Sequence, residues 1–210
     1  MNEKTFQKAA GISAELAARW FPHVNAAMNE FGITTPARQA AFIAQIGTES
    51  GGFITLSESF NYSIAGLSTF GGRLTASQRE QLGRRNDESA LPIERQRAIA
   101  NLVYGGRYGN KAAGDGYKFR GRGLKQITFL DNYLACGRAI GIDLITNPDL
   151  LLQDDYAARS AGWFWKANNC NSFADSGDFL GLTQRINGGT NGLADRKARL
   201  VIATKALATA

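Results

Sequence analysis

The sequence contains very little histidine and cysteine: among 210 residues there is one histidine, His23, and two cysteines, Cys136 and Cys170. With a single histidine, most kinds of zinc site are excluded. A Ser-His or Cys-His nucleophile is also excluded unless His23 is its histidine. His23 falls in an amphipathic helical pattern, which indicates a position at the edge of the core. The sequence therefore predicts no metal site, no cofactor and no catalytic triad.

Long apolar runs are also missing. No run approaches the roughly 18 residues that a membrane helix needs, and residues 1–16 have neither the apolar block nor the cleavage site of a secretory signal. We therefore expect synthesis in the cytoplasm and no stable membrane insertion. A cytoplasmic origin favours free thiols at Cys136 and Cys170, although their pairing stays open.

The formal net charge is +6. This charge predicts attraction to polyanions such as nucleic acid, anionic lipid or bacterial wall polymers, without choosing among them. One non-enzymatic alternative follows from it, a basic helical module that binds nucleic acid through residues 107–125. That alternative has no recognisable recognition helix or helix-turn-helix spacing.

The length suits one domain, residues 1–210, and the apolar periodicity is that of a mainly-α protein. Residues 64–104 are richer in arginine and glutamate than their flanks and are expected to form a small helical lobe. Residues 105–123 are rich in glycine but lack the GxxxxGK[ST] order of a phosphate-binding loop, so an irregular loop with a small hairpin is expected. Helices are predicted over 5–10, 14–31, 36–50, 75–82, 92–104, 129–141, 147–168, 178–186 and 193–208.

The stretch 37–62 contains two glutamates in different surroundings. Thr35-Pro36 is a helix start signal and Gly51-Gly52 a stop signal, so Glu49 falls in the last helical turn. The helix dipole and nearby apolar groups are expected there to keep its carboxyl protonated, as a general acid requires. Glu58 is expected to stay ionised in a polar loop. One carboxyl acting as acid and one acting as base can together hydrolyse a glycosidic bond. Glutamates at helix ends are, however, more often solvated surface charges.

Five motifs in order resemble those of glycoside hydrolase family 19, in the branch of small phage endolysins and bacterial lysozyme-like enzymes. Residues 44–52 (AQIGTESGG) resemble the catalytic-acid segment, and Glu58 with NYS at 61–63 resembles the base segment. Residues 117–128 (YKFRGRGLKQIT), followed by DNY at 131–133, are similar to the most recognisable signature. INGG at 186–189 and ADR at 194–196 fit the C-terminal elements.

The resemblance implies a lysozyme-like helical fold with a substrate cleft between a larger body and the small lobe. It also implies single-displacement hydrolysis with inversion. Glu49 would protonate the leaving oxygen, and Glu58 would activate a water that Thr128 helps to hold. The remaining implied site residues would contact sugar or support the carboxylates: Tyr117, Gln126, Asn132, Asn187 and Arg196.

Three positions depart from the family pattern. Thr48 stands where much of the family has histidine, so the orientation of Glu49 is expected to differ. Asp131 replaces a frequent aromatic of the plant chitinases, and Thr128 replaces serine. The departure at Asp131 weakens the transfer of chitin subsites to this chain, whereas the change at Thr128 is mild because both residues supply a hydroxyl.

Chitin and peptidoglycan share β-1,4-linked N-acetylglucosamine, so the reaction does not select the substrate. The basic charge, the lack of a signal peptide and the lack of a separate sugar-binding module favour the bacterial wall. We therefore expect a monomeric endolysin that cuts peptidoglycan glycan strands, has no nucleic-acid partner, and reaches the wall from the host cytoplasm through a membrane pore. A chitinase is the alternative.

Overall fold

The computed structural model describes residues 1–208, and in this range the chain is mainly helical, with three isolated backbone bridges and no longer strand. The predicted mainly-α class is confirmed. Residues 209–210, the end of the predicted domain, lie outside the described residues. The elements, with η for 3-10 helices, are α1 (Glu3–Ala10), α2 (Ala14–Glu30), α3 (Pro36–Glu49), η1 (Gly66–Arg73), α4 (Ala76–Leu82), α5 (Ile93–Tyr104), α6 (Asp115–Lys118), α7 (Leu130–Ile140), η2 (Pro148–Leu152), α8 (Asp154–Ala167), α9 (Cys170–Ser176), α10 (Phe179–Asn187) and α11 (Leu193–Ala208).

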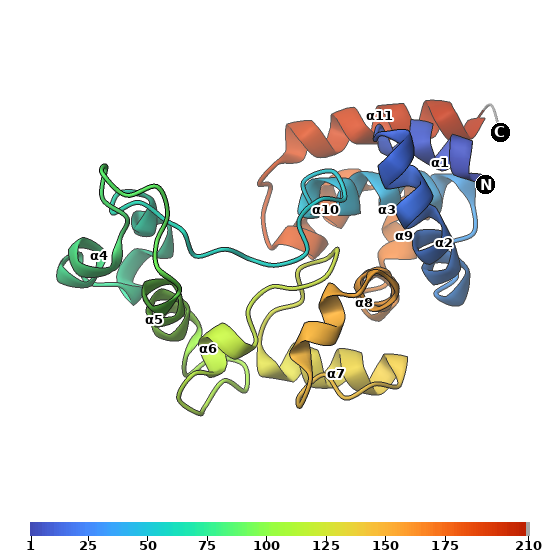
Figure 1. Cartoon of the computed structure of the whole chain (residues 1–210). Coiled ribbons are helices and arrows are strands. Elements are labelled where there is room, and N and C mark those ends of the chain that lie inside the picture. Colours follow the sequence, from blue (N-terminus) through green and yellow to red (C-terminus); the bar gives the residue numbers. More distant parts are fainter. Residues whose placement is uncertain (209–210) are drawn as a thin grey trace.

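The helices form two groups, which Figure 1 shows on opposite sides of the view. One group contains α1 to α3 and α8 to α11, with α11 packed along α3 and α1. The other contains α4 and α5. An extended segment after α3 runs from the first group to the second, while α6 and α7 lie below it.

The predicted helix starts are confirmed by their caps. Ser13 accepts a hydrogen bond from the backbone at the start of α2, and Thr35 does the same for α3, where Pro36 is the first helical residue. Thr75 and Gln78 form the predicted capping box of α4, each side chain bonding the other's backbone N–H. Such caps satisfy N–H groups that have no partner inside the helix.

The helix predicted to start at Asn147-Pro148 and to continue to 168 is divided into two elements, the first of which begins at Pro148 as expected. The chain forms η2, passes through Gln153 in an extended conformation, and begins α8 at Asp154. Asp154 and Asp155 lie in the first turn of α8, where the helix dipole favours acidic side chains. The short elements η1, α6 and α9 were not predicted, because each is too short to produce a clear apolar period.

Helix α3 lies inside the main core. All residues from 40 to 47 are buried, and α1, α9, α10 and α11 pack around the helix. Phe42 contacts the edge of the Trp165 ring at 5.3 Å between centroids. Just beyond the helix, the Trp20 indole donates a hydrogen bond of 2.9 Å to the Phe53 carbonyl. These contacts fix the C-terminal end of α3, where Glu49 lies.

A second, separate cluster of buried apolar side chains lies in the α4–α5 group. Apart from Phe60, its buried members fall in residues 64–104, the segment expected to form a small lobe. The role of this lobe beside a substrate cleft stays a prediction. The cluster consists of Phe60, Leu67, Leu74, Leu91, Ile99, Ala100 and Val103.

Two further sequence expectations concern the thiols and the membrane. Cys136 and Cys170 are both buried and unpaired. Among the helices of residues 1–208, none combines the length and apolar character that crossing a membrane requires.

Gly162 marks the contact between α2 and α8, and its substitution tests that packing. A Cβ at this position would collide with the ring of Phe31, the buried residue that ends α2. We expect Gly162→Ala to lower the free energy of unfolding by about 1–3 kcal/mol, the usual cost of overpacking. Urea unfolding measures it, with Gly72→Ala as control because a Cβ there meets open space. Equal losses in the two variants would contradict the predicted contact.

Candidate active site

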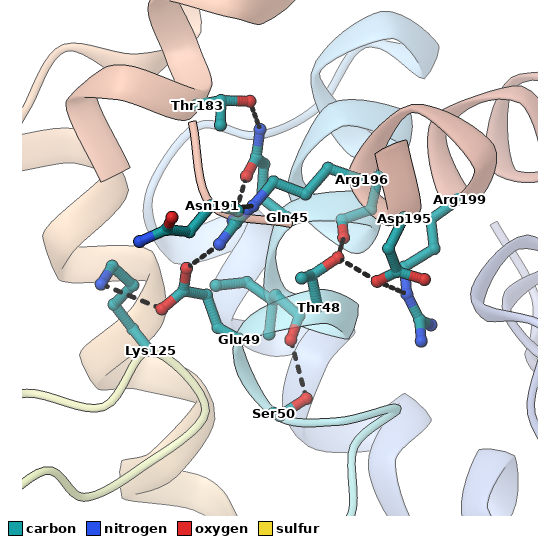
Figure 2. Close-up of polar contacts among 12 residues, drawn as sticks. Gln45, Thr48, Glu49, Ser50, Lys125, Thr183, Asn191, Asp195, Arg196 and Arg199 are labelled. Atoms are coloured by element: carbon teal, nitrogen blue, oxygen red, sulfur yellow. Dashed lines mark hydrogen bonds and ion pairs between the residues drawn. The ribbon is translucent and has the colours of Figure 1, made fainter. Parts of the chain in front are cut away.

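Glu49, the last residue of α3, faces two cations. The Arg196 Nη2 atom donates to its Oε1 at 2.6 Å, and the Lys125 Nζ lies 3.4 Å from its Oε2 (Figure 2). Only 12% of the Glu49 side chain is exposed. The expectation of apolar surroundings at this carboxyl is therefore wrong, because Arg196 and Lys125 both lie within ion-pair distance of it.

Arg196 is itself held in place by a buried polar network. Its Nη1 donates to the Gln45 side-chain oxygen at 2.5 Å, and its Nε donates to the Asn191 carbonyl at 3.1 Å. Gln45 in turn donates to the Thr183 hydroxyl at 2.9 Å. The network joins α3, α10 and α11 behind Glu49. Sequence reasoning assigned no role to Gln45 or Thr183, although Gln45 stands one helical turn before Glu49 on the same side.

Thr48, at the position of the family's histidine, turns away from Glu49. Its hydroxyl donates to the Asp195 carboxylate at 2.7 Å, and the Arg199 Nε bonds the same oxygen at 2.9 Å (Figure 2). The Thr48 hydrogen bond and the Arg199 guanidinium hold the pKa of Asp195 below its usual range. Thr48 therefore ties α3 to α11, and Glu49 is oriented by Arg196 and Lys125.

Glu58 lies in the extended segment after α3 and is bound from two directions. The Tyr104 hydroxyl, at the end of α5, donates to its Oε1 at 2.7 Å. The Gly121 N–H donates to its Oε2 at 3.0 Å, and the Glu58 N–H donates to the Gly121 carbonyl at 2.8 Å. Both partners are far from Glu58 in sequence.

The environment of Glu58 is not the solvated loop expected from its polar neighbours. Burial raises the pKa of its carboxyl above the usual value, although the hydrogen bonds from Tyr104 and Gly121 and the charge of Arg120 partly oppose this shift. The prediction failed because adjacent residues such as Ser57 and Ser59 do not form the wall around the carboxyl. That wall consists of Tyr104 and the segment around Gly121.

One hairpin contacts both glutamates. Arg122 and Ile127 exchange backbone hydrogen bonds of 3.1 and 2.8 Å, which close the small hairpin over residues 121–128. Gly121 bonds Glu58 and Lys125 bonds Glu49, so the two carboxyls are attached to the same short piece of chain. A predicted hairpin thus exists, slightly later in the chain than the expected range of 105–123.

Gly121 brings a further predicted residue to Glu58. A Cβ on Gly121 would lie 3.0 Å from the Gln126 Oε1 and 3.2 Å from the Glu58 Oε2. A side chain at position 121 would therefore crowd both residues, and Gln126 and Glu58 both lie next to Gly121. Gln126 has a positive φ of 60°, a conformation that non-glycine residues rarely adopt outside functional or tightly restrained positions.

Thr128 and Asn132 follow Gln126 in a connected set of hydrogen bonds. The Thr128 hydroxyl donates to the Gln126 carbonyl at 3.0 Å, and the exposed Asn132 amide donates to the Thr128 carbonyl at 2.9 Å. Since the hydroxyl hydrogen of Thr128 is engaged by the backbone, its oxygen is left to accept a hydrogen bond.

Among residues 1–208, neither Asn187 nor Tyr117 is hydrogen-bonded to Glu49 or Glu58. Asn187 ends α10, and its amide nitrogen is buried without a hydrogen-bond partner among residues 1–208. The guanidinium groups of Arg120 and Arg97 lie 4.1 and 5.5 Å from the centre of the Tyr117 ring. Within the described residues, no group of three or more His, Cys, Asp or Glu side chains could hold a metal ion.

Comparison with known proteins decides the family. A protein of Haemophilus influenzae described as a glycosyl hydrolase family 19 domain-containing protein is 38% identical over 191 residues, which cover 84% of this chain and 87% of the relative. The chain belongs to glycoside hydrolase family 19. The family's sequence model, described as chitinase class I, matches residues 94–179. That match includes the 121–128 hairpin but not Glu49 or Glu58.

Solved structures share this family 19 fold. Chitinase C from Streptomyces griseus superposes with a TM-score of 0.60 at 21% identity, covering 99% of this chain and 76% of that one. A bacterial family 19 chitinase gives a TM-score of 0.58 at 22% identity, covering 98% and 94%. Endochitinase 1 of Theobroma cacao is 49% identical over 57 residues, which are 27% of this chain and 18% of that protein. The chain is thus a glycoside hydrolase related to chitinases.

The raised pKa of Glu58 predicts a pH-dependent stability difference. A carboxyl whose folded-state pKa lies above its unfolded value contributes stability that is fully present below the unfolded pKa and lost as the pH rises through the folded pKa. We therefore expect Glu58→Gln to melt higher relative to the wild type as the pH rises from about 4 to about 7. Thermal unfolding across this range measures the difference. If the difference in melting temperature between Glu58→Gln and the wild type stayed constant with pH, a raised pKa of Glu58 would be contradicted.

Proposed function

We propose that this family 19 enzyme is an endolysin that hydrolyses β-1,4 glycosidic bonds of peptidoglycan glycan strands by single displacement with inversion. One observation supports the reaction above all others. Two carboxyls with opposite electrostatic surroundings are attached to one hairpin, Glu49 beside two cations and Glu58 in a desolvated position. In glycosidases the carboxyl with the raised pKa is usually the acid. The acid role of Glu49 and the base role of Glu58 are therefore assigned from the family motifs around them, AQIGTESGG at 44–52 and NYS at 61–63.

Each carboxyl has contacts that can assist its assigned role once the proton begins to move. When Glu49 donates a proton to the leaving oxygen, the carboxylate that remains is stabilised by Arg196 and Lys125. Desolvation raises the proton affinity of Glu58, so this carboxylate is a stronger base towards the attacking water.

The other site residues are assigned roles that match the hydrogen-bonding groups of their side chains. Thr128 accepts a hydrogen bond from the attacking water, because its own hydrogen is bonded to the Gln126 carbonyl. Gln126 lies next to Gly121, as Glu58 does, and is suited to orient the sugar at the reacting carbon. Tyr117, Asn132 and Asn187 are assigned to more distant sugar contacts.

The net charge of +6 supports the wall as substrate, because bacterial walls carry anionic polymers and chitin is uncharged. We infer a monomer that acts on the wall after release from the host cytoplasm through a membrane pore. Chitin hydrolysis is the second candidate. It is favoured by the local identity to a protein named Endochitinase 1 and by the chitinases that share the fold.

Digestion of purified peptidoglycan tests the proposal. We expect new reducing ends on the glycan, identified by mass spectrometry, and a higher kcat/KM on wall glycan than on chitin oligomers. Glu80→Gln is a matched control, since Glu80 is exposed on α4. Release of peptides alone would contradict glycan cleavage. A higher kcat/KM on chitin oligomers than on wall glycan would show that chitin, and not peptidoglycan, is the preferred substrate.

A further inference from the structure

Two neighbouring residues in the loop after α5, Arg107 and Tyr108, combine a cation with an exposed aromatic ring. The Tyr108 residue is 62% exposed, and its ring packs on the Phe129 ring with 4.8 Å between centroids. The Arg107 guanidinium lies 5.0 Å from the centre of the Phe129 ring and 5.5 Å from that of Tyr108. Such distances allow a cation–π interaction with both rings, which holds the guanidinium beside the exposed tyrosine.

This pair of residues adjoins the proposed catalytic base. The Phe129 ring also contacts the Tyr104 ring, with 5.0 Å between centroids, and the Tyr104 hydroxyl donates to Glu58. Burial and the Glu58 charge raise the pKa of Tyr104, whereas the Arg107 charge lowers it, which places the guanidinium near this hydroxyl. Arg107 and Tyr108 therefore continue the surface that begins at Glu58.

The backbone holds both rings in uncommon conformations. Tyr108 has a φ of 40° and Phe129 a φ of 75°. The Asp131 N–H donates to the Tyr108 carbonyl at 3.1 Å. The buried Asn110 amide donates to the Tyr104 carbonyl at 3.1 Å, and its oxygen accepts from the backbone at the start of α7 at 3.0 Å. Strained backbone that is restrained in this way occurs preferentially at functional sites, so the exposure of Tyr108 calls for a functional explanation.

Arg107 has the hydrogen-bonding capacity to bind an anion. Within residues 1–208 it forms no ion pair with a carboxylate, and its one hydrogen bond runs from Nη1 to the Val103 carbonyl at 3.3 Å. A guanidinium recognises a carboxylate through paired hydrogen bonds. The exposed ring of Tyr108 offers an apolar face against which the C–H groups of a sugar can pack.

We propose that Arg107 and Tyr108 form an accessory subsite for a sugar that carries a carboxylate, with the sugar on the Tyr108 ring and the carboxylate on Arg107. This inference rests on the proposed function, because wall glycan has such groups and chitin has none. The N-acetylmuramic acid unit has a lactyl carboxylate in strands without peptide. In strands with peptide this group is an amide, and the peptide supplies the carboxylates. The subsite therefore favours wall glycan over chitin through binding.

Substitution of Arg107 tests the selectivity. We expect Arg107→Gln to raise KM on peptide-free wall glycan by about tenfold, with kcat and the KM on chitin oligomers unchanged. Arg107→Lys keeps the charge without the planar fork and should recover part of the loss. Arg138→Gln is the matched control, because Arg138 is an exposed arginine in the last turn of α7.

Substitution of Tyr108 tests the sugar contact. Tyr108→Ala should raise KM about fivefold on both wall glycan and chitin oligomers, because both contain sugar rings. Tyr108→Phe keeps the ring and should keep the wild-type KM. Thermal unfolding checks that both variants are folded. A loss in the phenylalanine variant as large as that in the alanine variant would contradict packing of a sugar on the ring.

Wall glycan with its peptides intact identifies the source of the carboxylate. A loss in Arg107→Gln on peptide-free strands supports binding of the lactyl carboxylate, and a loss confined to peptide-bearing strands supports binding of a peptide carboxylate. An equal loss on chitin oligomers and on both wall glycans, or no loss on any of them, would overturn the inference.

Binding without turnover separates this inference from the proposed function. In nitrogen-15 NMR of the Glu49→Gln variant, the Arg107 Nε–H signal should move on addition of the disaccharide of N-acetylglucosamine and N-acetylmuramic acid, and should not move with chitobiose. Equal movement with the two disaccharides, or none with either, would overturn the inference. A wild type that does not cleave wall glycan would refute the proposed function instead, and the NMR result would still decide whether Arg107 binds a carboxylate.

Discussion

Glu49→Gln is expected to lower kcat on wall glycan by about 10²–10⁴-fold, the usual contribution of general acid catalysis. The amide has the size of the carboxyl and can still accept the Arg196 hydrogen bond, but it has no proton to donate to the leaving oxygen. Steady-state kinetics with Glu80→Gln as control measure the loss. Rates of Glu49→Gln equal to those of the control would reject the assigned role.

The leaving group distinguishes a lost acid from a damaged fold. On a chitooligosaccharide that carries a dinitrophenyl group, departure needs no proton, so Glu49→Gln should regain most of the wild-type rate. The variant is also expected to lose about 1–3 kcal/mol of stability, because the buried Arg196 and Lys125 then face a neutral amide. Activity that stays absent on the activated substrate would show that the variant lost more than its acid.

Glu58→Gln is expected to lower kcat by a similar factor, about 10²–10⁴-fold, for a different reason. The variant keeps an acceptor for the Tyr104 hydroxyl but cannot take a proton from the attacking water. A small anion needs no such activation. Azide should therefore restore part of the rate in Glu58→Gln and yield the α-glycosyl azide, the inverted product of a β-linked substrate.

The same additive provides the control for this prediction. Azide should not rescue Glu49→Gln on an unactivated substrate, because the leaving group there still lacks its proton. A rescue of both variants, or a β-glycosyl azide as the product, would contradict the division of roles between Glu49 and Glu58.

Local sequence signals predicted the position of the first carboxyl well. Thr35, Pro36 and the two glycines after Glu49 act on adjacent backbone, so they determine where α3 begins and ends regardless of the rest of the fold. The capping box of Thr75 and Gln78 could be predicted from the sequence for the same reason.

The electrostatic surroundings of the Glu49 and Glu58 carboxyls could not be predicted from the sequence. Glu49 was expected among apolar groups, yet its neighbours are Lys125 and Arg196, both more than seventy residues away. Glu58 was expected in water, yet Tyr104 and Gly121 cover it. A charged residue changes the protonation of a carboxyl through space, and tertiary packing decides which residues are near. The family resemblance placed Arg196 in the carboxylate network, which composition and periodicity alone did not.

The anomeric configuration of the first-formed product tests the central claim most directly. If Glu49 and Glu58 act together as acid and base around one water, proton NMR during early hydrolysis of a β-1,4-linked N-acetylglucosamine oligomer will show the α-anomer of the new reducing end, before mutarotation mixes the two forms. Initial accumulation of the β-anomer would contradict single displacement and would require a covalent or substrate-assisted route instead.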